Sequence, residues 1–455
     1  MKQRISSVEP PFNKISEPRR IPQVGTQEPC HCDPVNIRGV RFLAVTAYIL
    51  LNIHYLLACL QRTAIPGAIF NDLQSDLGLL GSQVTGLGSV YVVMYASSQV
   101  FAGMLVDRFG GKNMGILGGL FMTVGLALFA LAQTPAVLYI SRIITAIGQA
   151  FFYLCVVKIS HKLFPPKQFG MLIAISMALG FCGSILGTMP ITLLAKNIGW
   201  RYAFFGLGCI CAIASVATAV CLWSMHEKRN ASSSVTWRSV CNLFNEKGRF
   251  CFVTFQFWTF PAFFVLQTIV GQKFIQDYIG LSRTTAAMFT MLMTFCSILF
   301  CIFGAPLMRL FGGRRKPLVY LSAGLPTLAA IVMITGIKLT FPTWVFLTCF
   351  AMMSLSQCAA AATSALMSEI TDTKTIAFSA AVRNFFPYIG CGIVGWLCGF
   401  VLDHFATAPA ADGIIHYPPD AYVWNLGIMF IFSVIGFLMI IPIPETRGKH
   451  IYTAS

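Results

Sequence analysis

Twelve apolar stretches of about 20 residues dominate this sequence, and they limit its fold more than any single motif does. They lie near residues 41–61, 84–106, 114–132, 136–158, 170–192, 202–224, 250–271, 284–306, 317–337, 342–366, 377–402 and 422–443. A bilayer core about 30 Å thick is crossed by roughly 20 mostly apolar residues in a helix. Continuous runs of this length do not fit the short alternating strands of a membrane barrel. The sequence therefore predicts an all-α integral membrane protein with twelve transmembrane helices.

The composition excludes a soluble globular protein. Hydrophobic residues make up 56% of the chain and charged residues 11%, with a mean hydropathy of +0.73. The net charge of +16 would suggest nucleic acid as a partner of a soluble protein. In a membrane protein, however, the position of the cations along the chain decides their meaning. We expect no nucleic-acid partner, and most cysteines are irregularly spaced within the apolar runs, which disfavours a disulfide framework.

The distribution of Lys and Arg predicts the topology. With an even number of spans and an inner amino terminus, 24 of the 32 cations fall on the inner side. Five fall in outer loops, namely Lys196, Arg201, Lys273, Arg283 and Lys338. Cytoplasmic loops carry the excess of cations in membrane proteins. Both termini are therefore predicted to be cytoplasmic.

Polar segments divide the chain. Residues 1–40 read as a disordered cytoplasmic tail without the features of a signal peptide. Its Cys30 and Cys32 flank a histidine but have no matching ligand pair nearby, so we expect no metal site. A polar linker at 226–249 separates a six-helix bundle at 41–225 from a second one at 250–443, and 444–455 form a cytoplasmic tail.

The two halves repeat each other weakly. "RFLAVT" at 41–46 returns as "RFCFVT" at 249–254, and "GMLVDRFGGK" at 103–112 returns as "GAPLMRLFGGRRK" from Gly304. Such internal symmetry is typical of secondary transporters, whose substrate site lies between the repeats near the bilayer midplane. We therefore expect two pseudo-symmetric bundles around a central site.

Several motifs resemble those of the major facilitator superfamily. The decapeptide matches the loop signature that the family carries between its second and third helices, although Gly111 stands in place of a usual arginine. Arg142 with Gly148, "GWRYAFF" at 199–205 and "PETRG" at 444–448 also look like the family. The resemblance covers residues 40 to 448 and implies that twelve helices form the two bundles of the family's fold. It also implies transport by alternating access.

The resemblance assigns a role to the decapeptide. In this family the loop latches the inner ends of the two halves while the protein is open outward. The latch residues here would be Gly103, Asp107, Arg108, Gly110 and Lys112. The alternative is that these charges only anchor the loop under the positive-inside bias.

Three arginines lie at or within the spans, where an ionisable side chain costs about 2.5–3.5 kcal/mol and is a functional candidate by default. Arg383 lies in the eleventh span, with Tyr388 just over one turn further on. Arg62 ends the first span and Arg142 begins the fourth. A guanidinium offers a fixed fork of donors to a carboxylate or phosphate. The alternatives are snorkelling for Arg383 and interfacial anchoring for Arg62, while the resemblance associates Arg142 with helix packing and proton coupling.

Polar stripes at helical spacing supply the other candidates. The first span carries Tyr48, Asn52, Tyr55 and Arg62 on one face, with His54 beside it as a candidate proton carrier. The alternative for His54 is a packed, hydrogen-bonded histidine. Other spans offer Tyr91, Tyr95 and Gln99; Thr145, Gln149 and Tyr153; and Gln256, Thr259, Phe263 and Gln267. The substrate-binding candidates are Asn52, Tyr55, Arg62, Tyr91, Arg142, Gln149, Gln256, Gln267, Arg383 and Tyr388, and the proton-coupling candidates are His54 and Arg142.

No Asp or Glu falls near the middle of a predicted span. A site with arginines and amides but no carboxylates is electropositive and should prefer a small organic anion. We expect proton-driven uptake of a carboxylate or phosphate ester by a monomer in a bacterial inner membrane, without a cofactor, a metal or catalysis. No GxxxxGK[ST] motif suggests ATP drive. The alternatives are a multidrug or metabolite exporter, a non-transporting sensor and, more remotely, an intramembrane enzyme.

Overall fold

The computed structural model describes residues 37–223, 247–371 and 376–449. Most of the predicted tail at 1–40, including Cys30 and Cys32, and nearly all of the predicted linker lie outside these residues. Within the described chain, twelve helices are long and apolar enough to cross a membrane. The prediction of an all-α protein with twelve membrane helices is thus confirmed.

The first six spans are single helices. They are α1 (Ile37–Ala64), α3 (Gly81–Phe109), α4 (Gly111–Leu131), α5 (Pro135–Leu163), α6 (Pro166–Leu186) and α8 (Trp200–Trp223). Short helices connect some of them: η1 (Gly67–Ile69) and α2 (Phe70–Leu77) follow α1, and α7 (Met189–Ile198) follows α6. Gly110 separates α3 from α4 with φ 89° and ψ 153°, a conformation that favours glycine.

Two of the last six spans contain breaks. The seventh span consists of α10 (Lys247–Val265), a π-helical segment η2 (Leu266–Val270) and α11 (Gly271–Tyr278). The tenth consists of α14 (Thr343–Met353), η3 (Ser354–Ala359) and α15 (Ala360–Ile370). The others are α12 (Arg283–Leu310), α13 (Lys316–Lys338), α16 (Ile376–His404) and α17 (Pro419–Met439). The seventh span is longer than the predicted 250–271, so Lys273 lies in a helix and its prediction as a loop residue is wrong.

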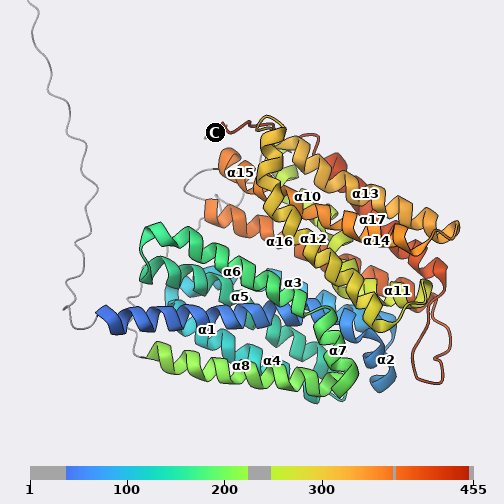
Figure 1. The fold of residues 1–455 in the computed structure, drawn as a ribbon, viewed down its shortest axis with the longest axis horizontal. Coiled ribbons are helices and arrows are strands. Elements are labelled where there is room, and N and C mark those ends of the chain that lie inside the picture. The colour runs from blue at the N-terminus through green and yellow to red at the C-terminus, as the bar shows by residue number, and fades with distance from the viewer. Residues whose placement is uncertain (1–36, 224–246, 372–375, 450–455) are drawn as a thin grey trace, which may run out of the picture.

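The helices form two bundles that meet along α3 and α16. We name the ends after the predicted topology: the inner end holds the start of α1 and the "PETRG" segment, and the outer end holds α2, α7 and α11. Figure 1 shows α12 running at an angle to α1 and reaching the first bundle near α7. Further contacts at the outer end join η1 to η2 and to α11. The two halves therefore close against each other at the outer end.

Glycines allow the close helix crossings. An added Cβ at Gly392, Gly395 or Gly399 of α16 would lie 2.0–2.4 Å from side-chain atoms of α3. Small residues let membrane helices approach in this way. The seam between the two halves is thus a tight glycine-lined crossing.

The packing of α6 on α1 gives a testable prediction. A Cβ at Gly183 would lie 2.2 Å from the carbonyl oxygen of Leu56, so Gly183→Ala must push α1 and α6 apart. Overpacking of this kind costs about 1–3 kcal/mol. We expect a lower melting temperature of the detergent-solubilised protein. Gly206→Ala in α8 is the matched control, because a Cβ there meets no atom within 4 Å, and it should melt like the wild type.

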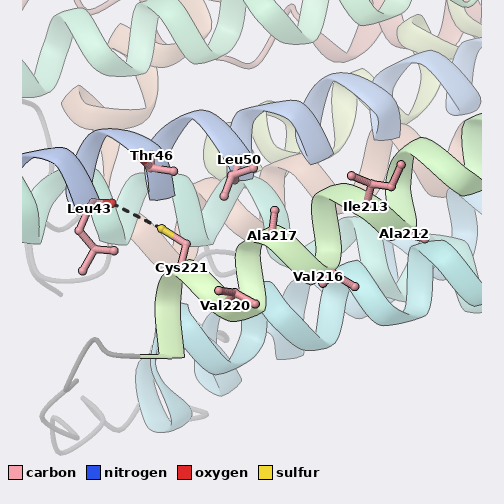
Figure 2. Close-up of a pocket in the computed structure, with 9 residues that line it drawn as sticks. All are labelled: Leu43, Thr46, Leu50, Ala212, Ile213, Val216, Ala217, Val220 and Cys221. Carbon is pink, nitrogen blue, oxygen red and sulfur yellow. Dashed lines mark hydrogen bonds between the residues drawn. The ribbon is translucent and has the colours of Figure 1, made fainter.

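A groove with a volume of about 790 Å³ lies between α1 and α8 (Figure 2). Its walls are almost wholly apolar, and Cys221 Sγ contacts the Leu43 carbonyl oxygen at 3.8 Å. Ile213, Val216 and Val220 are 63–71% exposed on this side, as expected for residues that face acyl chains. The groove offers no charged group to a polar substrate.

Candidate substrate-binding site

Arg62 lies between the two halves, close to the outer end of α1. Its Nη1 donates to the hydroxyl of Tyr388 on α16 at 3.3 Å, and its Nη2 contacts Cys59 Sγ at 3.9 Å. The buried Nε has no hydrogen-bond partner. Within the described chain, no carboxylate lies within 4.0 Å of this guanidinium. A half-buried cation with unused donors is thus available to an anion.

Aromatic side chains from both halves surround this cation. The ring of Tyr388 makes edge contacts with Tyr95 of α3 and with Phe260 and Phe264 of α10, at centroid distances of 5.2, 5.8 and 5.9 Å. One turn before Cys59 on α1, Tyr55 packs on Tyr153 of α5 at 5.6 Å. The site therefore combines one positive charge with ring walls and hydroxyl groups from five membrane spans, namely α1, α3, α5, α10 and α16.

A row of polar groups leads from this site toward the inner end. Gln99 Nε2 donates to the Tyr95 hydroxyl at 2.6 Å. Gln99 Oε1 accepts from Asn384 Nδ2 on α16 at 2.7 Å, so the row crosses between the halves. Tyr95 and Gln99 belong to the same predicted stripe as Tyr91. Tyr95 packs against Tyr388, whereas Tyr91 is turned into the first bundle.

Arg142 is enclosed within the first bundle and is 1% exposed. Its Nη1 donates to Gln61 Oε1 at 2.5 Å, its Nε donates to the Leu87 carbonyl at 3.3 Å, and the guanidinium lies 4.0 Å from the Tyr91 ring centroid. Gln61 also donates to the Tyr91 hydroxyl and to Gln149 Oε1. Arg142, Tyr91 and Gln149 thus form one network that ties α1, α3 and α5 together.

His54 also faces the interior of the first bundle. Its ring stacks on Phe152 at 4.9 Å, and its two nitrogens lie 2.9 Å from the Leu50 carbonyl oxygen and 3.0 Å from Ser215 Oγ of α8. The side chain is fully buried and turned toward α8. The structure does not bring His54 together with the Arg62 site.

The remaining amide candidates lie apart from Arg62. Asn52 donates to the Tyr48 carbonyl at 2.8 Å and lines a small cavity of about 220 Å³ between α1 and α6. Gln267 donates to Thr294 of α12 at 2.7 Å, inside the second bundle. Gln256 is half-buried on α10. The polar residues predicted to share one face of α1 therefore do not all face the same neighbours. Asn52 faces α6, whereas Tyr55 and Arg62 face the centre between the two halves.

Arg383 lies nearer the inner end of α16 than Tyr388. Its buried Nε has no hydrogen-bond partner. Gly390, almost two turns further along, shares its face of the helix. An added Cβ at Gly390 would lie 2.1 Å from the Phe257 carbonyl oxygen, so this face turns to α10. Arg383 is therefore not part of the ring of contacts around Arg62.

The sequence analysis missed a buried ion pair in the seventh span. Lys273 Nζ lies 3.0 Å from Asp277 Oδ1, and both side chains are fully buried near the outer end. Asp277 also accepts from the Tyr422 hydroxyl at 2.6 Å and from the Tyr417 backbone N–H at 3.2 Å, and it lies 3.0 Å from His416 Nδ1. The i, i+4 spacing of the pair was the available signal. Because the two charged residues are polar, the span predicted from hydropathy stopped before them, at residue 271.

The decapeptide lies at the inner end of the first bundle. Asp107 is paired with Lys158 of its own half at 3.3 Å, and its side chain is 61% exposed. Arg108 lies over the ring of Phe109, and Lys112 Nζ donates to the Trp223 carbonyl at 2.7 Å. A Cβ at Gly103 would meet no atom within 4 Å. The Asp107–Lys158 and Lys112–Trp223 contacts of this loop thus lie within the first half.

The "PETRG" segment binds to the inner end of the second bundle. Glu445 accepts from the backbone N–H groups of Arg315 and Lys316 at 2.9 Å each. Burial by itself would raise the pKa of Glu445, but backbone hydrogen bonds from Arg315, Lys316 and Arg447 hold it below its usual range. Arg315 also pairs with Glu369 at 2.8 Å. Glu445 thus attaches the "PETRG" segment to the start of α13, and Thr446, whose hydroxyl donates to Glu369, attaches it to α15.

Gln61, Cys59, Phe260 and Phe264 were not predicted as site residues. Gln61 is an amide inside a span, and that polarity is a signal by which the sequence could have identified it. Cys59 and the two phenylalanines look like packing residues in a sequence. Helical spacing places Cys59 beside Arg62, whereas only the tertiary structure brings the two phenylalanines beside Tyr388.

A family profile described as Major Facilitator Superfamily matches residues 51–395 of the chain. Among solved structures, a bacterial homologue of the human lysosomal transporter Spinster, in an inward-facing and unoccupied conformation, superposes with a TM-score of 0.69. It is 16% identical, and the alignment covers 88% of this chain and 97% of the other. This likeness shows the fold.

Curated relatives match a part of the chain. Monocarboxylate transporter 7 of Homo sapiens is 28% identical over 31% of this chain and 27% of its own length. Multidrug resistance protein 3 of Bacillus subtilis is 27% identical over 36% of this chain and 32% of its own length. The matched segment spans about a third or less of either relative. Because the family profile covers most of the sequence and the twelve-helix fold agrees with it, the chain belongs to the major facilitator superfamily of transporters.

Proposed function

We propose that the protein takes up a small organic anion, a carboxylate or a phosphate ester, by alternating access of its two halves. The observation that carries the proposal is Arg62, a half-buried guanidinium at the seam with a buried, unpartnered Nε and no described carboxylate within 4.0 Å. An isolated charge inside a membrane protein is costly, and a substrate anion would neutralise it. The similarity to a monocarboxylate transporter agrees with this substrate class.

The contacts favour a core site within the larger candidate set. Arg62, Tyr55 and Tyr388 would hold the anion, with Tyr95 and the phenylalanine rings against its apolar part. Arg142, Tyr91 and Gln149 would hold α1 in position through their hydrogen bonds with Gln61. Asn52, Gln256, Gln267 and Arg383 remain candidates for other stages of the transport cycle.

We further propose that protons drive uptake and that both termini are cytoplasmic in a bacterial inner membrane, with a monomer as the working unit. His54 and Arg142 are the proposed coupling residues.

The inner latch, when the protein opens outward, would be formed by Gly103, Asp107, Arg108, Gly110 and Lys112. The pairing of Asp107 with Lys158 in the same half is consistent with a released latch in an outward-closed state.

The alternative is export of drugs or metabolites. It is favoured by the similarity to Multidrug resistance protein 3 and by the aromatic walls around Arg62. Rings of this kind bind varied apolar bodies. A sensor that binds ligand without moving it is the third reading.

Proteoliposomes test these functions directly. Labelled lactate and glycerol 3-phosphate serve as carboxylate and phosphate-ester probes, with glucose as a neutral control. An inward proton gradient should drive accumulation of an anion and leave glucose outside. Accumulation only under the opposite gradient would indicate an exporter, and saturable binding without accumulation would indicate a sensor.

A further inference from the structure

The short helix α2 (Phe70–Leu77) lies at the outer end of the first half, and several of its polar residues reach the second half. Arg283, at the start of α12, donates from Nη1 and Nη2 to the two oxygens of Asp72 at 2.8 and 2.5 Å. Asn71 Nδ2 donates to Gln276 Oε1 of α11 at 3.1 Å. These contacts join the loop between the first two spans to the seventh and eighth spans.

A second group of contacts joins α2 to the segment between α16 and α17. Gln74 Nε2 donates to the Tyr417 hydroxyl at 2.9 Å, and both residues are buried. An added Cβ at Gly413 would lie 3.1 Å from Ser75 Cα, so the backbones are close here. Asp277 holds Tyr417 in place by accepting its backbone N–H. The second half therefore presents Tyr417 to α2 on a fixed support.

The ion pair in this seam is shielded from water. The side chains of Asp72 and Arg283 are 23% and 19% exposed. Burial raises the pKa of the Asp72 carboxyl, and Arg283 opposes that shift. A two-pronged guanidinium–carboxylate pair is geometrically specific and stronger than a neutral hydrogen bond. Arg283 Nη2 also donates to the Ala68 carbonyl at 2.8 Å, which adds a second attachment to the first half.

One residue of α2 points the other way. Asp76 accepts from Trp200 Nε1 of α8 at 2.7 Å, within the first half. The helix is thus anchored to its own bundle on one side and attached to the opposite bundle on the other. We propose that α2 is the outer latch of the transport cycle, and that Asp72, Asn71 and Gln74 are positioning residues that hold the outward-closed state.

Alternating access makes this assignment testable without a substrate. If α2 holds the outer end closed, breaking its bonds shifts the population toward the outward-open state. That shift exposes outer backbone amides and, in the same molecules, protects inner ones as the inner ends approach. A merely structural role would raise exchange at the outer end alone.

Hydrogen exchange measured by mass spectrometry on the full chain in nanodiscs provides the experiment. In Asp72→Asn and Arg283→Gln, we expect roughly fivefold faster exchange at residues 67–77 and 405–418. Slower exchange at residues 103–112 should accompany it. The double variant should resemble either single variant, because both remove the same pair. Gln74→Ala should give a smaller shift in the same directions.

Asp76→Asn is the matched control, because it removes the same charge from the same helix but breaks a bond within the first half. It should raise exchange around residues 70–77 and 200 without protecting 103–112. If Asp72→Asn, Arg283→Gln and Gln74→Ala also leave exchange at 103–112 unchanged, α2 is a structural brace and the latch is overturned. The same conclusion follows if Asp76→Asn protects the inner end as strongly as they do.

Discussion

Replacing Arg62 with glutamine is expected to weaken binding of a transported anion by roughly 10- to 150-fold, since hydrogen bonds to a charged group contribute about 1.5–3 kcal/mol. Arg62 contacts both halves near the centre of the seam, through its own helix and through Tyr388 of α16. Glutamine keeps a donor for the Tyr388 hydroxyl but removes the charge and the fork of donors. The variant should therefore fold and lose affinity. Binding of the accumulated probe to purified protein, measured by calorimetry, gives the ratio.

Two comparisons sharpen this result. Arg62→Lys keeps the charge without the planar fork and should retain part of the affinity. Arg383→Gln is the matched control in the other half, because Arg383 also lies in a membrane span but on a face that turns to α10. It should cost less affinity than Arg62→Gln. A larger loss in Arg383→Gln than in Arg62→Gln would transfer the binding site to the inner end of α16.

The fold could be predicted well because the bilayer converts sequence length directly into helices. Twelve apolar runs of about 20 residues leave few other structures with satisfied backbone groups. The seventh span was cut short because Lys273 and Asp277 lower the local hydropathy. In the structure they neutralise each other within one helix, so the span continues to Tyr278. A hydropathy profile scores each residue separately. Whether a charged side chain can be buried depends instead on whether an opposite charge lies beside it, as Asp277 lies beside Lys273.

The candidate site around Arg62 could be predicted only in part from the sequence. The cost of a charge inside a span identified Arg62, and helical spacing connected it to Tyr55. The same cost identified Arg142, which the structure encloses among Gln61, Tyr91 and backbone carbonyls of the first bundle. Sequence reasoning could not separate the two arginines, because the difference lies in which neighbouring helix each one faces. That information appears only when the helices pack.

The same limit applies to the outer latch. The segment "FNDLQSDL" at 70–77 looks like an ordinary polar loop between two spans. Its meaning depends on Arg283 and Tyr417, which lie more than 200 and 300 residues away in the sequence. Short loops between membrane helices thus carry information about the transport cycle when they lie at the seam. Hydropathy analysis treats them only as separators.

Breaking the buried Lys273–Asp277 pair is expected to cost about 3–5 kcal/mol of stability, because removal of one partner leaves the other charged and buried. Asp277→Ala should be the most damaging single change, since it also removes the acceptor for Tyr422 and Tyr417. Lys273→Met should destabilise less, because the Tyr422 and Tyr417 donors still reach the carboxylate. Thermal unfolding in detergent measures the changes in melting temperature.

The double variant Lys273→Met with Asp277→Asn separates a charge effect from a packing effect. It leaves no unpaired charge, and asparagine still accepts one of the hydrogen bonds. We therefore expect it to be more stable than the sum of the effects of Lys273→Met alone and Asp277→Asn alone predicts. Lys196→Met on α7 is the control, because Lys196 is an exposed lysine at the same end and should leave the melting temperature unchanged. Strict additivity would mean that the two charges do not stabilise each other, and that Asp277 acts only as an acceptor for the tyrosines that position the outer seam.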